Sequence, residues 1–214
     1  MLSLQINVSL QRNMNNSIQN IRWSENVILV DADYVDKVAF NLIVNFERML
    51  GRRIPQAELA KWMDCVALDG GIRPGENEIL VVLIHQKDKT KLENFTPSDY
   101  VKDIDGKAFR DHLGEFSIGV YPIEDIAGSE NYFSDALQLI AAQKEVKRIM
   151  VVPNAEDSYI YNNVRAMLKD VDDEKRITLL SMQPMPNWIF RQEILGYSLL
   201  AALGISSEEI NSKS

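Results

Sequence analysis

The sequence has few of the side chains that build most metal clusters, with one cysteine, Cys65, and two histidines among 214 residues. A single cysteine excludes an intrachain disulfide, and so few sulfur and imidazole ligands exclude a zinc cluster of Cys and His. We expect Cys65 to be a core residue of a helix. Any metal site must therefore draw its ligands mainly from carboxylates.

Long apolar runs are also absent. The most apolar segment, residues 188 to 205, is interrupted by Arg191, Gln192 and Glu193, which is typical of a helix in a water-soluble protein and not of a membrane span. The chain does not open with a basic segment followed by an apolar one, so we expect no secretory signal and a cytoplasmic protein.

Basic residues are outnumbered, with 23 Lys and Arg against 31 Asp and Glu and a net charge of −8. Phosphates need a local basic patch, so this balance argues against broad nucleic-acid binding. The candidates for phosphate contacts are Lys87, Lys89 and Lys91 in one segment and Arg52 with Arg53 at a helix end. The alternative for all five is solvated surface charge.

The composition, with 46% hydrophobic and 25% charged residues, is that of a globular protein. Length predicts one domain, which we assign to residues 25 to 205. Residues 1 to 24 are expected to be an arm or linker whose first half alternates like an edge strand, although Met14 is an alternative start. Residues 206 to 214 are expected to be a flexible tail.

Apolar runs alternate with helical repeats along the domain. Strands are predicted at residues 27 to 32, 78 to 85, 116 to 123, 148 to 153 and 176 to 182. Helices are predicted at residues 35 to 50, where Gly51 is expected to stop the helix, and at residues 55 to 66, 130 to 145, 156 to 170 and 187 to 203. The alternation predicts an α/β fold: a three-layer α/β/α sandwich with about five mainly parallel strands.

Two segments are open to more than one interpretation. Residues 86 to 114 are charged and broken by Pro and Gly, so they are either a functional loop or an excursion with short helices. The last predicted helix has apolar residues over much of its circumference. We expect one side of it to be core, and either its other side or the N-terminal strand to provide a homodimer contact.

Carboxylates gather where strands end. Asp31 and Asp33 follow the first predicted strand, in the stretch VILVDADYVD. Glu156 and Asp157 follow the fourth, in the stretch RIMVVPNAED. Asp135 lies on the helix before the fourth strand. Open parallel sheets bind ligands beyond the carboxyl ends of their strands, so we expect these acids to share one site. Converging carboxylates suit Mg²⁺ or Mn²⁺, which can activate water and stabilise charge on a phosphate.

Each acid also has a structural alternative. Asp31 could accept backbone hydrogen bonds at the turn, and Asp33 could cap the following helix. Asn154 with Asp157 approximates a capping box at the start of another helix. Asp135 could be a solvated residue in a first helical turn.

The order of these acids resembles the PIN-like nucleases, and their NYN branch in particular. Asp31-Ala32-Asp33-Tyr34 corresponds to an Asp-Gly-x-Asn-like element after the first strand, and Asp135 to an acid on the helix before the fourth. The PNAED stretch ending at Asp157 corresponds to a Ser-Gly-Asp-x-Asp-Phe-like element. The resemblance covers the layout of residues 27 to 182 but only short motifs.

The resemblance implies a PIN-like sheet and metal-dependent cleavage of RNA. Asp31 would be the principal catalytic residue and metal ligand. Asp135 and Asp157 would complete the site, with Asp33 and Glu156 as auxiliary acids. The cofactor would be Mg²⁺ or Mn²⁺.

Three departures from the family pattern leave a second class open. Tyr34 replaces the Asn, Ala155 stands where an Asp is expected, and Pro153 with Asn154 replaces Ser-Gly. Losing a carboxylate weakens metal affinity and charge stabilisation, so the chain could be a catalytically degenerate binding or scaffold protein.

The stretch from Asp31 to Val35 also fits the Asp-x-Asp-x-Thr/Val signature of haloacid-dehalogenase-like phosphatases, with a nucleophilic first Asp and an acid/base second Asp. That family needs a strand ending in Ser or Thr, a Lys and a later acidic pair. Here the strand before residue 86 ends in His85, which is either a general base or a structural histidine. A response-regulator receiver would need an Asp and a Lys that the later strands do not supply.

Overall fold

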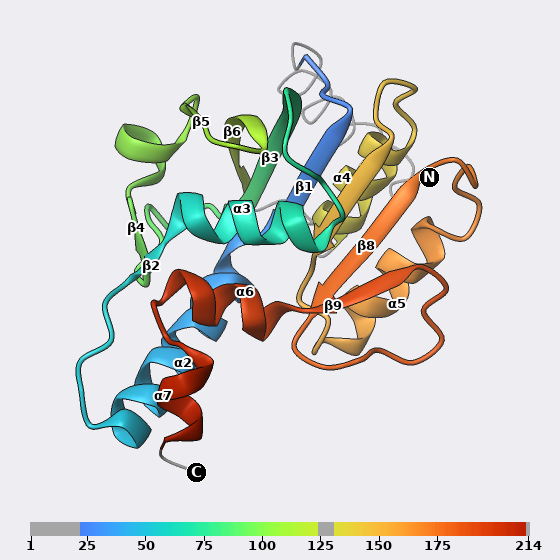
Figure 1. The fold of residues 1–214 in the computed structure, drawn as a ribbon. Coiled ribbons are helices and arrows are strands. Elements are labelled where there is room, and N and C mark those ends of the chain that lie inside the picture. Colours follow the sequence, from blue (N-terminus) through green and yellow to red (C-terminus); the bar gives the residue numbers. More distant parts are fainter. Residues whose placement is uncertain (1–21, 124–130, 213–214) are drawn as a thin grey trace.

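The computed structural model describes residues 22 to 123 and 131 to 212 (Figure 1). Within them, one sheet has seven strands and another has two. The strands are β1 (Asn26–Asp31), β2 (Ala57–Glu58), β3 (Asn77–Gln86), β4 (Phe95–Thr96), β5 (Ala108–Arg110), β6 (Gly114–Ile123), β7 (Arg148–Val152), β8 (Arg176–Ser181) and β9 (Arg191–Ile194). The helices are α2 (Ala32–Leu50), α3 (Leu59–Asp69), the π-helix η1 (Tyr100–Ile104), α4 (Tyr132–Ala141), α5 (Ser158–Met167), α6 (Leu195–Ala202) and α7 (Ser207–Asn211).

The large sheet runs in the order β5-β6-β3-β1-β7-β8-β9. All its neighbouring strands are parallel except β5, which pairs antiparallel with β6. The two-stranded sheet pairs β2 with β4. The predicted α/β fold with a mainly parallel sheet is therefore confirmed, but the prediction of about five strands is too low, because β5 and β9 were missed.

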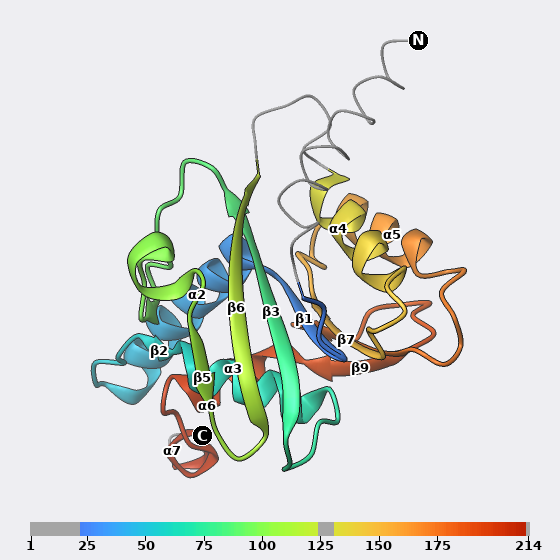
Figure 2. The same cartoon turned by 90° about the horizontal axis from the view of Figure 1, so that it is seen from above.

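Helices pack on both faces of the large sheet, as Figures 1 and 2 show. In β1, Ile28 and Val30 contribute to one buried cluster with α2, α3 and α6, whereas Val27 and Leu29 contribute to a second with α4 and α5. Successive side chains of a strand point to opposite faces. A strand covered on both faces is therefore apolar throughout, which explains the continuous runs in β1 and β3.

Helix α2 begins and ends where local chemistry requires it. The side chain of Asp31 caps its first turn. Gly51 ends it with φ of 68°, a left-handed conformation that costs glycine little, and the Gly51 N–H donates to the Glu47 carbonyl. The prediction that Gly51 stops this helix is confirmed.

The prediction of one helix over residues 187 to 203 is wrong in its first half. Asn187 has a positive φ of 57°, so a right-handed helix cannot run through it. The chain instead forms β9, which pairs parallel with β8, and α6 begins only at Leu195. On α6, Leu195 and Leu199 are buried whereas Tyr197 is exposed, as expected for a helix with one core side.

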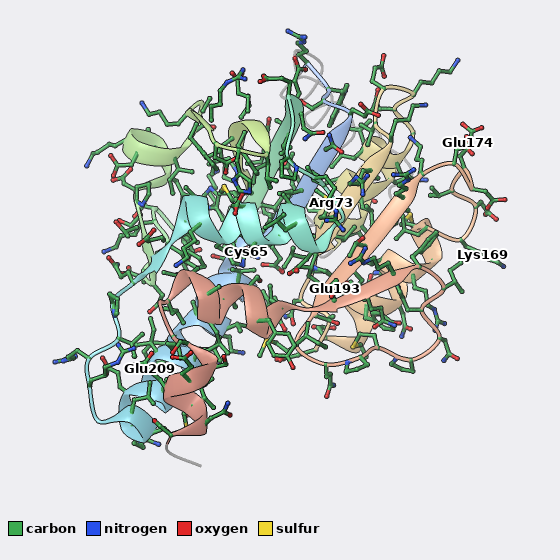
Figure 3. All side chains as sticks on the ribbon, viewed as in Figure 1. Cys65, Arg73, Lys169, Glu174, Glu193 and Glu209 are labelled. Atoms are coloured by element: carbon green, nitrogen blue, oxygen red, sulfur yellow. The ribbon has the colours of Figure 1, made fainter. Side chains whose placement is uncertain are left out.

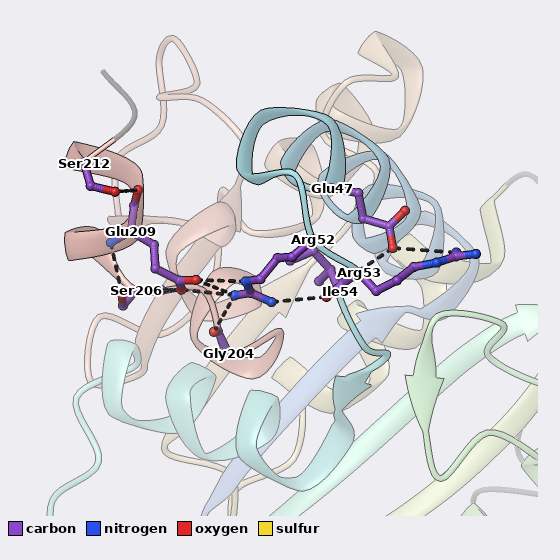
Figure 4. A network of polar contacts seen from close by, with 8 residues as sticks. All are labelled: Glu47, Arg52, Arg53, Ile54, Gly204, Ser206, Glu209 and Ser212. Carbon is purple, nitrogen blue, oxygen red and sulfur yellow. Dashed lines mark hydrogen bonds and ion pairs between the residues drawn. The ribbon is translucent and has the colours of Figure 1, made fainter.

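The prediction of a flexible tail from residue 206 is wrong in part, because residues 207 to 211 form the capped helix α7. Figure 4 shows how it is held: the guanidinium of Arg52 donates to both carboxylate oxygens of Glu209, at 2.9 and 3.1 Å. Ser206 and Glu209 also form a capping box. Arg52, a predicted phosphate contact, is therefore engaged in joining the end of α2 to α7.

The irregular segment 86 to 114 is an ordered excursion containing β4, η1 and β5. It includes one π-helix, in agreement with the expectation of short helical pieces. Cys65 lies on α3, as expected, but is only half-buried (Figure 3). The predicted N-terminal strand and the question of Met14 fall on residues 1 to 21, outside the described part. No helix among the described residues is long and apolar enough to cross a membrane.

Candidate functional site

The candidate site lies at the carboxyl edge of the sheet, beside β1 and β7. The order of the parallel strands reverses there, because β3 and β6 follow β1 on one side whereas β7 and β8 lie on the other. In doubly wound sheets this reversal leaves a crevice where ligands bind. The structure places four of the predicted acids at this edge, at the ends of β1 and β7 or the starts of the helices that follow: Asp31, Asp33, Glu156 and Asp157.

Asp31 ends β1 and caps α2. Its Oδ1 accepts a hydrogen bond from the Tyr34 N–H at 3.0 Å, so the cap of this helix is Asp31 and not Asp33. Burial raises the pKa of Asp31 to about 6; the hydrogen bond from Tyr34 opposes this shift, and the charge of Asp33 adds to it. A carboxyl group that titrates near neutral pH is typical of functional sites, although buried structural acids show the same shift.

Asp33 and its neighbour Asp36 hold the segment that follows β3. The Gln86 N–H donates to Asp33 at 2.6 Å, and the Asn94 N–H donates to Asp36 at 2.8 Å. Burial raises the pKa of both carboxyl groups, and these backbone donors lower it. Both acids therefore anchor residues 86 to 94 against α2.

Tyr34 packs deeply below this edge. The residue is 4% exposed. Burial raises the pKa of Tyr34, and the nearby Glu156 carboxylate raises it further. An exposed acid from the turn after β7 and a buried hydroxyl from α2 therefore lie close together across the strand reversal.

Asp157 is occupied as a helix cap. Its Oδ1 accepts hydrogen bonds from the N–H groups of Tyr159 and Ile160, at 2.8 and 3.3 Å. The expected capping box from Asn154 is therefore wrong, because the cap of α5 is Asp157 itself. Ala155, where the resembled family has an acid, is buried in a small apolar cluster with Tyr161 and Leu179. That position is part of the core.

Asp135 lies in the first turn of α4 and is half-buried. Burial raises its pKa, and no charged group among the described residues contributes to that shift. Had Asp135 lain within a few ångströms of Asp31 or Asp157, the charge of that neighbour would be expected to contribute. The pKa of Asp135 therefore gives no sign of contact with Asp31 or Asp157.

The three predicted metal ligands are not grouped compactly in the described part of the chain. There, the group of three metal-binding side chains whose ligand atoms all lie within 4.8 Å of one another does not include Asp31, Asp135 or Asp157. An ion bound by three carboxylates at about 2.0 to 2.6 Å would need such proximity. The Mg²⁺ or Mn²⁺ site at these three acids therefore stays a prediction.

The group that does converge is Asp64 on α3 with Asp111 and His112 between β5 and β6. Burial raises the pKa of Asp64 to about 6; the Asp111 carboxyl raises it further and His112, whose Nδ1 is 3.9 Å away, lowers it. No sequence motif pointed to this group, because its members come from elements far apart in the chain.

The remaining sequence candidates lie around the segment after β3. His85 is buried, and its Nδ1 lies 2.8 Å from the Gln86 carbonyl, which agrees with a structural role. Its ring stacks on Tyr100 with centroids 4.1 Å apart. Lys91 pairs with Glu93 at 3.0 Å, so it is less available to phosphates than expected.

Together, these features define an α/β protein with a doubly wound, mostly parallel sheet, whose carboxyl edge carries acids engaged as helix caps and loop anchors. Within that class, the chain belongs to the family of unknown function DUF6621, whose model matches residues 20–210. No curated protein matches the chain, and no solved structure does. The resemblance to PIN-like nucleases therefore stays a prediction.

Proposed function

We propose that this chain is a PIN-like binding protein in which the nuclease-type acidic site serves structure and not metal-dependent cleavage. The observation that supports this proposal most directly is that the predicted site acids have structural roles. Asp31 and Asp157 cap helices, and neither of them contributes to the pKa shift of Asp135. A three-layer PIN-like architecture agrees with the helices on both faces of the sheet.

The position of Ala155 gives the proposal independent support. The family motif would place a carboxylate there, but Ala155 is 3% exposed and packs on Tyr161 and Leu179. A charged side chain would be desolvated at that position without a compensating partner, which is strongly unfavourable. At this position of the motif, the chain therefore has a buried apolar side chain and no carboxylate.

A metal-dependent ribonuclease is the second candidate. It is favoured by the pKa of Asp31, raised to about 6 chiefly by burial, with Asp33 contributing. A cation between these acids and Glu156 would stabilise their charged forms. The phosphatase alternative is weaker, because β3 ends in His85 and Gln86 and not in Ser or Thr.

Calorimetric titration with Mn²⁺ separates the two candidates. The wild type, Asp31→Asn and Asp64→Asn would be compared, with a single-stranded RNA cleavage assay in the same buffer. Asp64→Asn is the matched control, because it neutralises one acid of the compact group formed by Asp64, Asp111 and His112. We expect no RNA cleavage and no Mn²⁺ binding that depends on Asp31.

Two results would contradict the binding-protein proposal. The first is Mn²⁺ binding that disappears in Asp31→Asn and persists in Asp64→Asn. The second is Mn²⁺-dependent RNA cleavage by the wild type that Asp31→Asn lacks. The first would establish a metal site built on Asp31, and the second would establish the nuclease function.

A further inference from the structure

Three parallel strands begin with an arginine at the amino edge of the large sheet, opposite the edge that carries the acids: Arg148 in β7, Arg176 in β8 and Arg191 in β9. Arg148 and Arg176 are register partners on neighbouring strands, so their side chains leave the same face of the sheet. Arg191 pairs with Thr178, two residues after Arg176, and therefore lies on that face too. Met150, two residues after Arg148, belongs to the buried cluster with α3, so α3 covers this face.

The segment that follows α3 lies against these arginines. A Cβ placed at Gly71 would be 2.9 Å from Nη1 of Arg148 and 3.5 Å from Nη1 of Arg191. Two guanidinium groups therefore pass close to the same glycine, which has no side chain to displace them. Arg73 follows two residues later on this segment (Figure 3), is exposed, and donates from its Nη1 to the Ile72 carbonyl at 3.1 Å.

Arg148 is half-buried and is held by neutral groups. Its Nε donates to Asn26 Oδ1 at 3.3 Å, and its Nη1 donates to the Gly70 carbonyl at 2.6 Å. These acceptors orient the guanidinium, but neither of them carries a charge that would balance it. Arg52, by contrast, pairs with Glu209, whereas Arg148 forms no ion pair with any described residue. Charges removed from water are normally paired, so Arg148 lacks a counter-ion.

Neighbouring arginines make the surroundings of Arg148 more positive. Burial lowers the pKa of Arg148, and the charge of Arg176 lowers it further. Arg191 and Arg73 act in the same direction, whereas the charge of Glu25 opposes them. Arg73 and Arg176 are exposed, and neither forms an ion pair in the part of the chain that the structure describes. Like charges held close together repel one another, and a bound anion would compensate that repulsion.

The acids near this group are on the side of Arg191. Glu193 accepts hydrogen bonds from Nε and Nη2 of Arg191, at 2.8 and 2.6 Å. Burial raises the pKa of Asp69 to about 6, with the charge of Glu193 adding to the shift and that of Arg191 opposing it. Neither acid is among the charges that act on the pKa of Arg148. The positive surplus is therefore centred on Arg148, with Arg191 at the rim.

Guanidinium groups from three separate elements suit a small anion with several oxygens. A guanidinium can donate two parallel hydrogen bonds to a phosphate, whose oxygens point in several directions and can serve more than one arginine. An extended polyanion is less suitable, because a net charge of −8 opposes its approach. Lys87 and Lys89 follow β3 at the opposite edge of the sheet, so they do not extend this group into a longer basic track.

We propose that Arg73, Arg148 and Arg176 form a binding site for a small, multiply charged phosphate anion such as pyrophosphate. Arg148 is held in place by its neutral acceptors, and the two exposed arginines complete the site. The anion supplies the counter-charge that this group lacks. The inference goes beyond the proposed function and does not depend on it, because none of the acids at the carboxyl edge takes part.

Calorimetric titration with inorganic pyrophosphate tests this site, in a buffer with EDTA so that no metal ion can hold the anion elsewhere. The variants are Arg176→Gln and the double variant Arg73→Gln with Arg176→Gln, which change exposed side chains and should leave the far-UV circular dichroism unchanged. Arg48→Gln with Arg53→Gln is the matched control, because it makes the same change in net charge at the end of α2. We expect affinity to fall by about threefold or more in the single variant and about tenfold or more in the double variant. The control should bind like the wild type.

The proposal is overturned if pyrophosphate does not bind the wild type at millimolar concentration, or if the double variant binds it with unchanged affinity. Weakening of equal size in the control would also overturn it, because general electrostatic attraction would then explain the binding. Binding of a short single-stranded RNA without binding of pyrophosphate would refute a small-anion site. None of these results concerns the acids at the carboxyl edge, which are tested with Mn²⁺, so failure here and failure of the proposed function are distinguishable.

Discussion

A single carboxyl group, that of Asp31, connects folding energetics with the candidate site. Its ordinary pKa of 3.8 is raised to about 6 in the folded protein, chiefly by burial. The folded state therefore binds the proton more tightly than the unfolded state does. The stability that this proton provides is fully present below about pH 4 and is lost as pH rises through about 6. At neutral pH the charged Asp31 opposes folding.

Replacing Asp31 by Asn should therefore stabilise the protein at pH 7.5. The shift of the Asp31 pKa from 3.8 to about 6 corresponds to about 3 kcal/mol of unfavourable free energy at this pH. Asn has no charge and keeps an oxygen that can accept the Tyr34 N–H, so we expect most of this free energy, about 2 kcal/mol, to be recovered. Urea denaturation at pH 7.5 and pH 4 measures the change, and the gain should vanish at pH 4. Asp31→Ala, which also loses the cap, should gain less. Destabilisation by Asn at pH 7.5 would show that a favourable partner holds the charge of Asp31.

Strand β9 and helix α7 near the C-terminus form through contacts with distant segments, and local sequence patterns did not predict them. Strand β9 exists because its backbone pairs with β8. Helix α7 has only five residues, too few for stability in isolation. It is supported by its capping box, by the ion pair between Arg52 and Glu209, and by Ile210 packing against the core (Figure 4).

Replacing Arg52 by Gln should loosen α7 without unfolding the domain. The ion pair is partly exposed, with 38% of the Arg52 side chain and 36% of the Glu209 side chain accessible, so we expect a loss of only about 0.5 to 1 kcal/mol. Hydrogen exchange should become faster at the amides of residues 209 to 212. Arg53→Gln is the control, because Arg53 is 96% exposed and 3.9 Å from Glu47. Equal exchange rates in the two variants would show that the Arg52 pair does not hold α7.

At the scale of the whole molecule, the two buried clusters make one structural unit of the described chain. Strand β1 contributes to both clusters, and α6 packs against α3 on the same face as α2. The C-terminal segment is therefore part of the domain core. Ile189 and Tyr197 remain exposed nearby, and the expected homodimer contact stays a prediction for that surface.

Truncating Leu199 on α6 should destabilise the entire domain. Leu199 is fully buried, and a Leu-to-Ala change at such a site costs about 2 to 5 kcal/mol. Urea unfolding should stay a single transition, with coincident tryptophan fluorescence and far-UV circular dichroism. Tyr197→Ala, on the exposed side of the same helix, should change stability by less than about 0.5 kcal/mol. Two separate transitions would show that α6 is not part of one cooperative unit.

The sequence by itself determined the features that depend on local patterns. Continuous apolar runs predicted β1 and β3, because strands covered on both faces bury every side chain. Helical spacing and Gly51 predicted α2 and its end. Acids after strands were correctly expected at the carboxyl edge, because parallel strands bring their ends to one side of a sheet.

Only the tertiary structure decided which of those side chains meet. Whether Asp31, Asp135 and Asp157 converge depends on how far each helix is displaced from the strand ends, and periodicity does not encode that distance. The stacking of His85 on Tyr100, the group around Asp64 and the pairing of β9 likewise depend on contacts between residues that are apart in the chain. Local sequence specifies which residues are buried and in what conformation, whereas the crossovers between strands specify which neighbours they have there.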